Sequence, residues 1–585
     1  MKRSENFRIN LSFIFIFAAA AVISYNLFVL TYVRHHSYLR TAQAQNQNIN
    51  NVLARGNIYL ANGKVSNAAD NSEYLAATNK KFPLAYLVPV EIKPESSDEV
   101  ANWLGSVFET GADQIKEIID SRSDNFRVVS RKITNEQVET IKTAGIKGIG
   151  VSYEIDRFYP GNQLASSVIG FLGYSGESRS GQYGIEAFYN DELFGKRWSA
   201  GNHVAGSGAV NLITKLFKGF GADNNLEQEE TIDRPADVVL SIDKNIQQII
   251  EDKLDALMEK WQAVGGTIIV QDPNTGKIVA MADRPTFDPN NYNEYEPGIF
   301  LNKGVQEIFE PGSSFKPITM AMGLDLGVVS PQTTFEDKGF REVSGYKIKN
   351  FSERTFGIVT MSQVLEKSVN TGAMFVQDQV GDDNFLDYII NFGFGQKTGI
   401  DMPGEVNGNI SNLYSGRKIN FLTASFGQGI AVTPLQLINA YSAIANGGKL
   451  MRPYVVERII KEGGEQEVIG PEIVTIPISE KTATKLKTML VSVVDNGFDK
   501  ARISGYDIAG KTGTAQIPDG KGGYQENEYI HDFVGFAPAF DPKFVILIKI
   551  DRPQGITFAA DSLSPTFREI AAYLINYYNI PPTRR

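Results

Sequence analysis

The sequence predicts an α+β protein, in which one closed domain follows a mixed α/β region and a single N-terminal membrane span. Three observations predict this architecture. Residues 236–282 have the pattern of a strand, a helix and a hairpin, residues 533–578 have that of two strands and a terminal helix, and residues 11–30 form an uncharged apolar run. Because strands from both ends of the second region can share one sheet, residues 236–585 are expected to close into a unit.

The apolar run from Leu11 to Leu30 comprises 20 residues, about the length that a helix needs to cross a hydrocarbon core of ~30 Å. A cleaved signal peptide would have an apolar region of only roughly 7–15 residues, so we expect the span to be retained. We assign residues 1–10 to a cytoplasmic tail and 11–31 to a transmembrane helix. Basic residues slightly favour this orientation; they are Lys2, Arg3 and Arg8 before the span, and Arg34 and Arg40 after it.

Residues 32–235 are assigned to a stalk followed by a mixed domain. Residues 32–52 are rich in Gln and Asn, which is typical of a polar stalk. Further along, a strand-like run at 126–129 lies between helical patterns at 98–110 and 135–143, with Gly-rich turns between them. This region contains no catalytic pattern.

The last region contains most of the regular elements. The helix at 244–261 is predicted from apolar residues spaced three and four apart, and the helix after Thr433 from the capping signature Thr-Pro-Leu-Gln. Predicted strands lie at 236–242, 266–270, 278–282, 533–536 and 544–550, and predicted helices at 244–261, 434–445 and 565–578.

Composition excludes several classes of function. The net charge of -10 and the lack of a Lys/Arg cluster argue against nucleic acid as a partner. The chain has no cysteine, which excludes a thiol nucleophile, a disulfide framework and a thiolate metal site. None of its four histidines lies in a Gly-x-Ser-x-Gly or a His-Glu-x-x-His motif, so lysine is the expected base, and we expect neither a metal nor a cofactor.

Ser313 and Lys316 form a nucleophile with a base three residues away, after Pro311-Gly312 and before an apolar stretch. If a helix begins at Ser313, the two side chains lie on one face, and Pro317 is tolerated because it falls within the first turn. Unpaired N–H groups at that helix end favour an alkoxide on the serine and a neutral amine on the lysine.

Two further patterns have the residues of an acyl-transfer site. Ser368 and Asn370 are two residues apart and cannot share one face of a regular helix, so we expect both in a loop between helices. The run Lys511-Thr512-Gly513-Thr514 begins a predicted edge strand. There the two threonines face one way, and the glycine lets a substrate backbone lie alongside.

Each pattern alone is weak, because the chain contains two decoys. Ser415 to Lys418 also fits Ser-x-x-Lys, and Lys397 to Gly399 also fits Lys-Thr-Gly. The first is a polar loop with no apolar helix behind it, and the second is a turn among glycines. For any single triplet, a solvated turn or helix cap is the expected structure.

Together, in this order, the patterns at 313, 368 and 511 resemble the active-site set of the penicillin-binding proteins and serine β-lactamases. Flanking motifs resemble class B penicillin-binding proteins over nearly the whole chain from Arg55. These motifs are Arg55-Gly56, Arg157-Phe158-Tyr159-Pro160, Gly170-Phe171, Gly184-Ile185-Glu186, Phe309-Glu310-Pro311-Gly312, Phe426-Gly427-Gln428-Gly429 and Phe533-Val534-Gly535-Phe536-Ala537-Pro538.

The resemblance implies a dimerisation-type pedestal domain within 32–235 and a transpeptidase domain at 236–585, with an antiparallel sheet flanked by helices and a helical subdomain. It also implies a D,D-transpeptidase that cross-links peptidoglycan through a serine acyl-enzyme. Ser313 would attack the D-Ala-D-Ala bond of a donor stem peptide, neutral Lys316 would take the proton, and Ser368 would relay it to the leaving D-alanine.

By the same resemblance, backbone N–H groups of Ser313 and Thr514 would form the oxyanion hole, and Asn370 would orient the donor amide. The donor's terminal carboxylate would be held by Lys511, Thr512 and Thr514. Lys316 can act as a base only if its pKa is lowered, for which burial beside Phe315 and the nearby Lys511 cation are the expected causes. β-Lactams would imitate the donor and stall at the acyl stage.

Related activities on the same fold remain open. Glu405 and Asn409 fit a Glu-x-x-x-Asn pattern that could activate water in a β-lactamase, but their surroundings resemble a structural turn of penicillin-binding proteins. A D,D-carboxypeptidase uses the same serine and passes the acyl group to water, and the triplets do not separate it from a transpeptidase. A β-lactam sensor is disfavoured, because sensors usually have several membrane spans.

The resemblance also predicts partners and location. No histidine lies between His36 and His203, where a glycan-polymerising module would need one, so we expect a separate polymerase of the SEDS family. Residues 531–538 and 544–553 resemble the division type more than the elongation type, which suggests septal synthesis with division proteins. The protein would be a single-pass protein of the bacterial cytoplasmic membrane, with its catalytic domain on the outer side.

Overall fold

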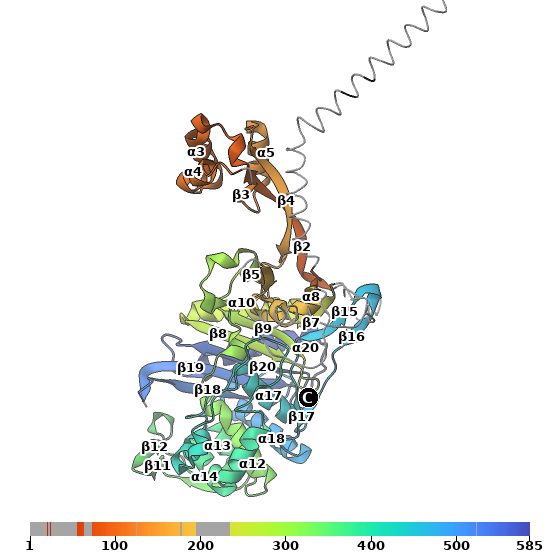
Figure 1. Ribbon diagram of the computed structural model, residues 1–585. Helices are drawn as coiled ribbons and strands as arrows, with labels where there is room; N and C mark the ends of the chain where they lie inside the picture. Colours follow the sequence, from red (N-terminus) through yellow and green to blue (C-terminus); the bar gives the residue numbers. More distant parts are fainter. Residues whose placement is uncertain are drawn as a thin grey trace, which may run out of the picture. The chain divides into compact units, whose positions relative to one another are not determined.

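The computed structural model describes residues 55–63, 73–123, 126–175, 178–194, 235–521 and 523–584, together with Ala20 and Ser24. They form two compact units, Asn79–Phe158 and the combination of Arg55–Thr78 with Tyr159–Arg585 (Figure 1). Apart from Ala20 and Ser24, the predicted transmembrane segment 11–31 lies outside the described residues. Within the described residues, every helix is too short or too polar to cross a bilayer. The domain boundary at residue 235 stays a prediction.

The first unit is a small α/β layer. Its elements are the later part of β2 (Tyr74–Leu87), β3 (Arg127–Ser130), β4 (Ile149–Phe158), α3 (Ser97–Phe108), α4 (Ala112–Asp120) and α5 (Asn135–Ala144). Strand β2 pairs with both β3 and β4, and the helices bury apolar stripes such as Val100, Ala101 and Leu104. The strand expected at 126–129 and the helices expected at 98–110 and 135–143 are confirmed within two residues.

The second unit is built around a five-stranded antiparallel sheet in the order β18-β19-β20-β8-β9. The strands are β18 (Ala509–Pro518), β19 (Tyr524–Ala537), β20 (Phe544–Asp551), β8 (Gly265–Gln271) and β9 (Ile278–Arg284). Strands from the beginning and the end of residues 236–585 thus share one sheet, as predicted. Strand β18 forms an edge, which leaves one side of its backbone open for a peptide to pair with.

Helices cover both faces of this sheet (Figure 1). Helices α10 (Lys244–Trp261) and α20 (Ser564–Tyr577) pack on one face, and α17 (Pro434–Ala445) and α18 (Glu480–Ser492) on the other. Strands β8 and β20 are therefore buried at every residue, which explains their runs of consecutive apolar residues at 268–270 and 544–548. The predicted cap of α17 is confirmed, since Thr433 and Gln436 form a capping box worth about 1 kcal/mol.

Strand β7 (Asp237–Asp243) lies in a different sheet. It pairs in parallel with β1 (Ile58–Ala61) and antiparallel with β15 (Val456–Ile460), and β15 continues to β16 (Gln466–Val468). The strand itself was predicted, but its partners come from distant parts of the chain. Local periodicity does not encode such long-range pairing.

Short elements complete the second unit. They include α6 (Ser166–Ile169), α7 (Gly184–Phe188), α8 (Asn190–Phe194), α11 (Lys303–Gln306), α12 (Lys316–Asp325), α13 (Met361–Glu366), α14 (Asn370–Val380), α15 (Asp382–Asn391), α16 (Lys418–Ala424) and α19 (Ala559–Ser562). Small strand pairs are β5 (Leu172–Ser175) with β6 (Ser178–Gly181), β10 (Thr334–Asp337) with β13 (Gly357–Thr360), β11 (Phe340–Val343) with β12 (Tyr346–Lys349), and β14 (Leu450–Met451) with β17 (Ile473–Thr475).

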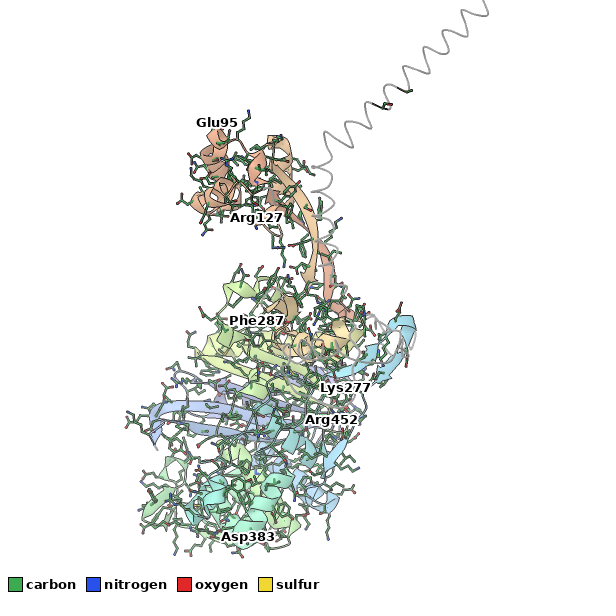
Figure 2. The ribbon with its side chains drawn as sticks, in the orientation of Figure 1. Glu95, Arg127, Lys277, Phe287, Asp383 and Arg452 are labelled. Carbon is green, nitrogen blue, oxygen red and sulfur yellow. The ribbon has the colours of Figure 1, made fainter. Side chains whose placement is uncertain are left out.

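The core of this unit is continuous from the sheet into the segments before it. Phe287, which is labelled in Figure 2, is fully buried, and its ring lies edge-on to those of Phe171 and Phe300. Aromatic pairs in this arrangement add about 0.5–1.5 kcal/mol each to the burial of their area. The same core extends to the helices around α12, and it fixes the elements that carry the candidate site.

Candidate active site

Ser313 lies in a short 3-10 helix, Gly312–Phe315, that runs directly into α12. The α-helix therefore begins at Lys316 and not at Ser313 as expected. In a 3-10 turn, side chains three residues apart are eclipsed, which brings the two side chains together more closely than an α-helix would. Pro317 falls in the first turn of α12, as predicted, where its missing N–H leaves no acceptor unpaired.

The Lys316 amine is the centre of the site. It is buried and lies 2.9 Å from Ser313 Oγ, 3.0 Å from Ser368 Oγ and 2.6 Å from the Ser368 carbonyl oxygen. The carbonyl oxygen can only accept a hydrogen bond. A neutral amine has two N–H donors and one lone pair, so it can donate to the Ser368 carbonyl and hydroxyl while accepting the proton of the Ser313 hydroxyl. This is the arrangement that a general base requires.

The surroundings of Lys316 favour the neutral amine. Burial lowers the pKa of Lys316 well below its ordinary value, and the positive charge of Lys511 lowers it further. Both causes were expected from the sequence, and Phe315 beside it is fully buried. In its neutral form, the lysine can accept a proton from serine without first losing one of its own.

Ser368 lies between α13 and α14 in a left-handed conformation, with φ of 56°. This backbone conformation costs a residue other than glycine about 1–3 kcal/mol. In return, the carbonyl and the hydroxyl of the same residue both reach Lys316. The sequence predicted Ser368 in a loop between helices, but it gave no indication of the strained backbone.

Asn370 is the first residue of α14 and not a loop residue as expected, because the break between the helices covers residues 367–369. Its Nδ2 donates to the carbonyl oxygen of Lys349, at the end of β12, over 3.0 Å. Next to this strand end, the ring of Phe351 lies edge-on to that of Phe558, with centroids 5.4 Å apart. Phe558 directly precedes Ala559, whose N–H donates to Thr514 in β18 over 3.1 Å.

The run Lys511 to Thr514 lies inside β18, and the predicted alternation holds. Lys511 and Gly513 are buried, whereas Thr512 and Thr514 are partly exposed. The Lys511 amine donates to the carbonyl oxygen of Thr512 over 3.0 Å. Burial lowers the pKa of Lys511 to about 8, although the carboxylate of Asp532 opposes this effect. The nucleophile turn is close by, because a Cβ on Gly312 would lie 3.4 Å from the Thr514 carbonyl oxygen.

The loop before α17, which contains the flanking motif Phe426-Gly427-Gln428-Gly429, braces the nucleophile turn. The Gly312 N–H donates to the Gly427 carbonyl oxygen over 3.0 Å, and Glu310 accepts from the Gly429 N–H over 2.9 Å. Gly427 has φ of 80°, and a Cβ there would lie 2.2 Å from the Gly312 carbonyl oxygen. Only glycine fits this position. In the sequence, the motif Phe-Gly-Gln-Gly was therefore the feature that could have indicated this contact.

Two other buried residues near the turn were missed. The Tyr441 hydroxyl, from α17, donates to the Ser314 carbonyl oxygen over 2.6 Å. Asp532, in β19, is fully buried opposite Gly513. Asp532 lies at the start of an apolar strand sequence, where a charged residue is unusual. In the sequence, only this exception indicated a special role for the residue.

Both decoys are structural. The Ser415 hydroxyl is exposed and donates to the Asn412 carbonyl oxygen over 2.7 Å, while Lys418 pairs with Asp382 at 2.7 Å. In the second decoy, the side chain of Glu405 accepts from the backbone of Thr398 over 2.6 Å. This carboxylate is buried in its own turn, and its two oxygens accept from the backbone of Thr398 and Gly399, so it stabilises that turn.

Comparison with known proteins agrees with this geometry. Residues 266–572 match the penicillin-binding protein transpeptidase domain, and residues 52–215 match the penicillin-binding protein dimerisation domain. Stage V sporulation protein D of Bacillus subtilis is 33% identical over 508 residues, covering 85% of this chain and 75% of that protein. The chain belongs to the class B penicillin-binding proteins. Its domain order, dimerisation domain before transpeptidase domain, is the one predicted from the flanking motifs.

Other members of the family are similar in sequence and structure. The peptidoglycan D,D-transpeptidase FtsI of Buchnera aphidicola is 30% identical over 471 residues, which cover 79% of this chain and 77% of that one. Among solved structures, penicillin-binding protein 3 of Mycobacterium tuberculosis in complex with aztreonam has a TM-score of 0.63 and 28% identity, over 74% of this chain and 92% of that one. These likenesses extend over both domains of the family.

Proposed function

We propose that this protein is a D,D-transpeptidase that cross-links peptidoglycan stem peptides through a serine acyl-enzyme. One observation carries the proposal: a buried amine with a lowered pKa lies within hydrogen-bond distance of the hydroxyls of both Ser313 and Ser368. Relatives named as peptidoglycan D,D-transpeptidases support the assignment of substrate. The reaction class is acyl transfer, without a metal or cofactor.

In the acylation step, Ser313 Oγ attacks the carbonyl carbon of the donor's penultimate D-alanine. Its proton passes to the Lys316 amine, and the peptide bond to the terminal D-alanine breaks as the tetrahedral intermediate collapses. Ser368, which accepts from the same amine, relays that proton to the leaving nitrogen. Backbone N–H groups of Ser313 and Thr514 stabilise the oxyanion. The short distance between the nucleophile turn and β18 supports this role.

The donor peptide is held by the edge of β18 and by α14. An extended peptide that pairs with β18 as an added strand places its terminal carboxylate at Lys511, Thr512 and Thr514, beside the open backbone at Gly513. Asn370 donates to Lys349, so its side-chain oxygen stays available for the donor's amide N–H. An amine of a second stem peptide then attacks the ester carbonyl carbon and forms the cross-linking amide bond, while the bond to Ser313 Oγ breaks and the proton lost by the amine returns to Ser313 Oγ. A β-lactam that acylates Ser313 stops at the ester.

We further propose that the protein is anchored by residues 11–31 and works on the outer side of the bacterial cytoplasmic membrane in septal synthesis. The apolar run in the sequence supports the anchor, and the likeness to penicillin-binding protein 3 and to FtsI supports the division role. A separate SEDS-family polymerase supplies the glycan strands, and division proteins recruit the pair. The predicted domain boundaries at residues 32, 236 and 585 belong to this proposal.

A turnover assay with the full chain in detergent tests the reaction. The donor is a stem peptide ending in D-Ala-D-Ala, and the acceptor is a peptide with a free side-chain amine. We expect release of D-alanine together with a covalent donor–acceptor product, detected by mass spectrometry. Release of D-alanine without that product would identify a carboxypeptidase, and a stable acyl-enzyme with β-lactam but no turnover would identify a sensor. Either result would contradict the proposal.

A further inference from the structure

Asp532 occupies a buried position directly behind the nucleophile turn. In the sheet register it lies opposite Gly513 of β18 on one side and Lys549 of β20 on the other. Paired residues of antiparallel strands place their side chains on the same face. A Cβ on Gly513 would lie 2.0 Å from Asp532 Oδ2 and 2.4 Å from the Pro311 carbonyl oxygen. The carboxylate therefore fills the space that the missing glycine side chain leaves below the turn.

This carboxylate has no exposed surface, and within the described residues neither of its oxygens has a hydrogen-bond partner. The nearby Ser314 hydroxyl donates instead to the Pro311 carbonyl oxygen, over 2.8 Å. An ionised carboxylate without hydrogen bonds is costly in a protein interior unless a positive charge lies nearby. The charges around Asp532 therefore determine what it does.

Two ammonium groups face Asp532 across the sheet. Lys549 of β20 donates to Asp551 over 2.6 Å and lies 3.7 Å from a carboxylate oxygen of Glu307, so its charge already has two carboxylates. Lys511 is two residues before Gly513 and lies on the same face of β18. Within the part of the chain that the structure describes, its amine donates only to the backbone carbonyl oxygen of Thr512. Asp532 is thus the carboxylate that serves Lys511.

The remaining neighbours carry no competing charge. Tyr441 faces Asp532 from α17, and burial and this carboxylate raise its pKa well above the ordinary value, so it stays neutral. From the nucleophile turn, the neighbour is the Ser314 hydroxyl, which is uncharged. Among the residues that the structure describes, no carboxylate bonds to Lys316, whose amine contacts two serine hydroxyls and a carbonyl oxygen. Among the described residues, a carboxylate therefore lies behind Lys511, and none lies beside Lys316.

The electrostatic effects agree with this geometry. Burial raises the pKa of Asp532 to about 7, against the lowering effects of the nearby Ser314 hydroxyl and of the Lys511 and Lys549 charges. Asp532 in turn raises the pKa of Lys511, while nothing comparable opposes the lowering of the pKa of Lys316. Two amines this close cannot both be charged easily, so a carboxylate beside one of them determines which amine holds the proton.

We propose that Asp532 is a positioning residue that keeps the proton on Lys511 and thereby keeps Lys316 neutral. The inference rests on the proposed function, in which Lys511 binds the donor carboxylate as a cation and Lys316 acts as the base. Asp532 touches neither substrate nor the reacting atoms. It acts through Lys511, and Gly513 makes room for it.

The pH profile of acylation tests this assignment. Wild-type protein and Asp532→Asn are labelled with fluorescent penicillin between about pH 5 and about pH 10, a range that contains the lowered pKa of Lys511, about 8. Without the carboxylate the pKa of Lys511 falls, so Lys511 loses its positive charge at a lower pH. The alkaline limb of the labelling rate against pH should therefore move down by about one pH unit or more. Asp551→Asn is the matched control, since it removes a buried carboxylate that serves Lys549, and its alkaline limb should not move.

An unchanged alkaline limb in Asp532→Asn would overturn the inference. Whether penicillin labels Ser313 in the wild-type protein is a separate result. If the wild-type protein is not labelled, that result contradicts the proposed function and not the role assigned to Asp532. A double-mutant cycle gives a readout that does not depend on activity. The thermal stability of Asp532→Asn, Lys511→Met and the double variant is compared with that of the wild-type protein. If the two charges pair, the double variant should lose less stability than the sum of the losses in the two single variants. Additive losses of stability would contradict the pairing. If Asp532→Asn does not fold, rescue of folding by Lys511→Met supports the pairing, and failure of rescue contradicts it.

Discussion

The pattern Ser-x-x-Lys occurs twice in this chain, and the two copies have opposite surroundings. At the first, Lys316 is buried and contacts two serine hydroxyls at 2.9 and 3.0 Å. At the second, the Lys418 amine lies 2.7 Å from Asp382 and 3.1 Å from Asp378, and the hydroxyl of Ser415 donates to its own turn. The sequence pattern is the same, but only the first copy can act as nucleophile and base.

The difference teaches that the neighbours of the lysine decide its chemistry. Carboxylates beside Lys418 stabilise the ammonium, which has three donors and no lone pair and therefore cannot accept a proton. Burial without a carboxylate has the opposite effect on Lys316, whose pKa is lowered. The second pair of copies, Lys511 to Gly513 and Lys397 to Gly399, differs in a related way: one lies in an edge strand, and the other is a turn bonded to Glu405.

The largest effect is expected from exchanging the two serines for alanine. Ser313→Ala removes the atom that forms the ester, so covalent labelling by fluorescent penicillin should be abolished. Ser415→Ala removes an exposed hydroxyl that donates to Asn412 and accepts from Asn420, so labelling should proceed at the wild-type rate. Gel fluorescence of both variants at equal protein concentration makes the comparison. Labelled Ser313→Ala, with correct folding verified by circular dichroism, would remove the proposed nucleophile.

The lysines of the two copies give the next largest effect. Lys316→Arg places a group there that stays charged and cannot accept the serine proton, so the acylation rate should fall by about 10²–10⁴-fold. Lys418→Arg keeps the charge that its acidic neighbours pair with, so the rate should stay within about twofold of wild type. Stopped-flow acylation measures both rates. An undiminished rate in Lys316→Arg would show that another group serves as base.

The comparison also shows how far sequence could reach. Elements with a strong local pattern were predicted within a few residues, among them α10, α17 and the strands β8 and β20, because periodicity and capping are local properties. The partners of β7 were not predictable, since β1 and β15 lie far away along the chain. Pairing at that range depends on the complete fold.

Within the site, sequence predicted the contact between Ser313 and Lys316 but not how it is made. A 3-10 turn replaces the expected α-helix start, and Ser368 reaches Lys316 through a left-handed backbone that no residue preference indicates. The carboxylate of Asp532 and the bracing loop at Gly427 became recognisable only from the three-dimensional neighbours. Charges that act across strands are set by register, which the sequence does not reveal.

The smallest effect concerns the glycines of the two Lys-Thr-Gly copies. In Gly513→Ala, the new Cβ would meet Asp532 Oδ2 at 2.0 Å and the Pro311 carbonyl oxygen at 2.4 Å, so the strand or the nucleophile turn must shift. Such overpacking costs about 1–3 kcal/mol, and we expect a lower melting temperature together with slower labelling. Gly399→Ala has open space, with Arg452 Cδ nearest at 3.6 Å, but its φ of +78° strains alanine by about 1 kcal/mol.

The two glycine variants therefore separate stability from activity. Both should melt earlier than wild type, but only Gly513→Ala should also label more slowly, because only its Cβ lies beside the nucleophile turn. Differential scanning fluorimetry and penicillin labelling on the same samples provide the two readouts. If Gly513→Ala labelled at the wild-type rate, the turn would tolerate displacement at β18, and the close packing of Pro311, Gly513 and Asp532 would have no bearing on catalysis.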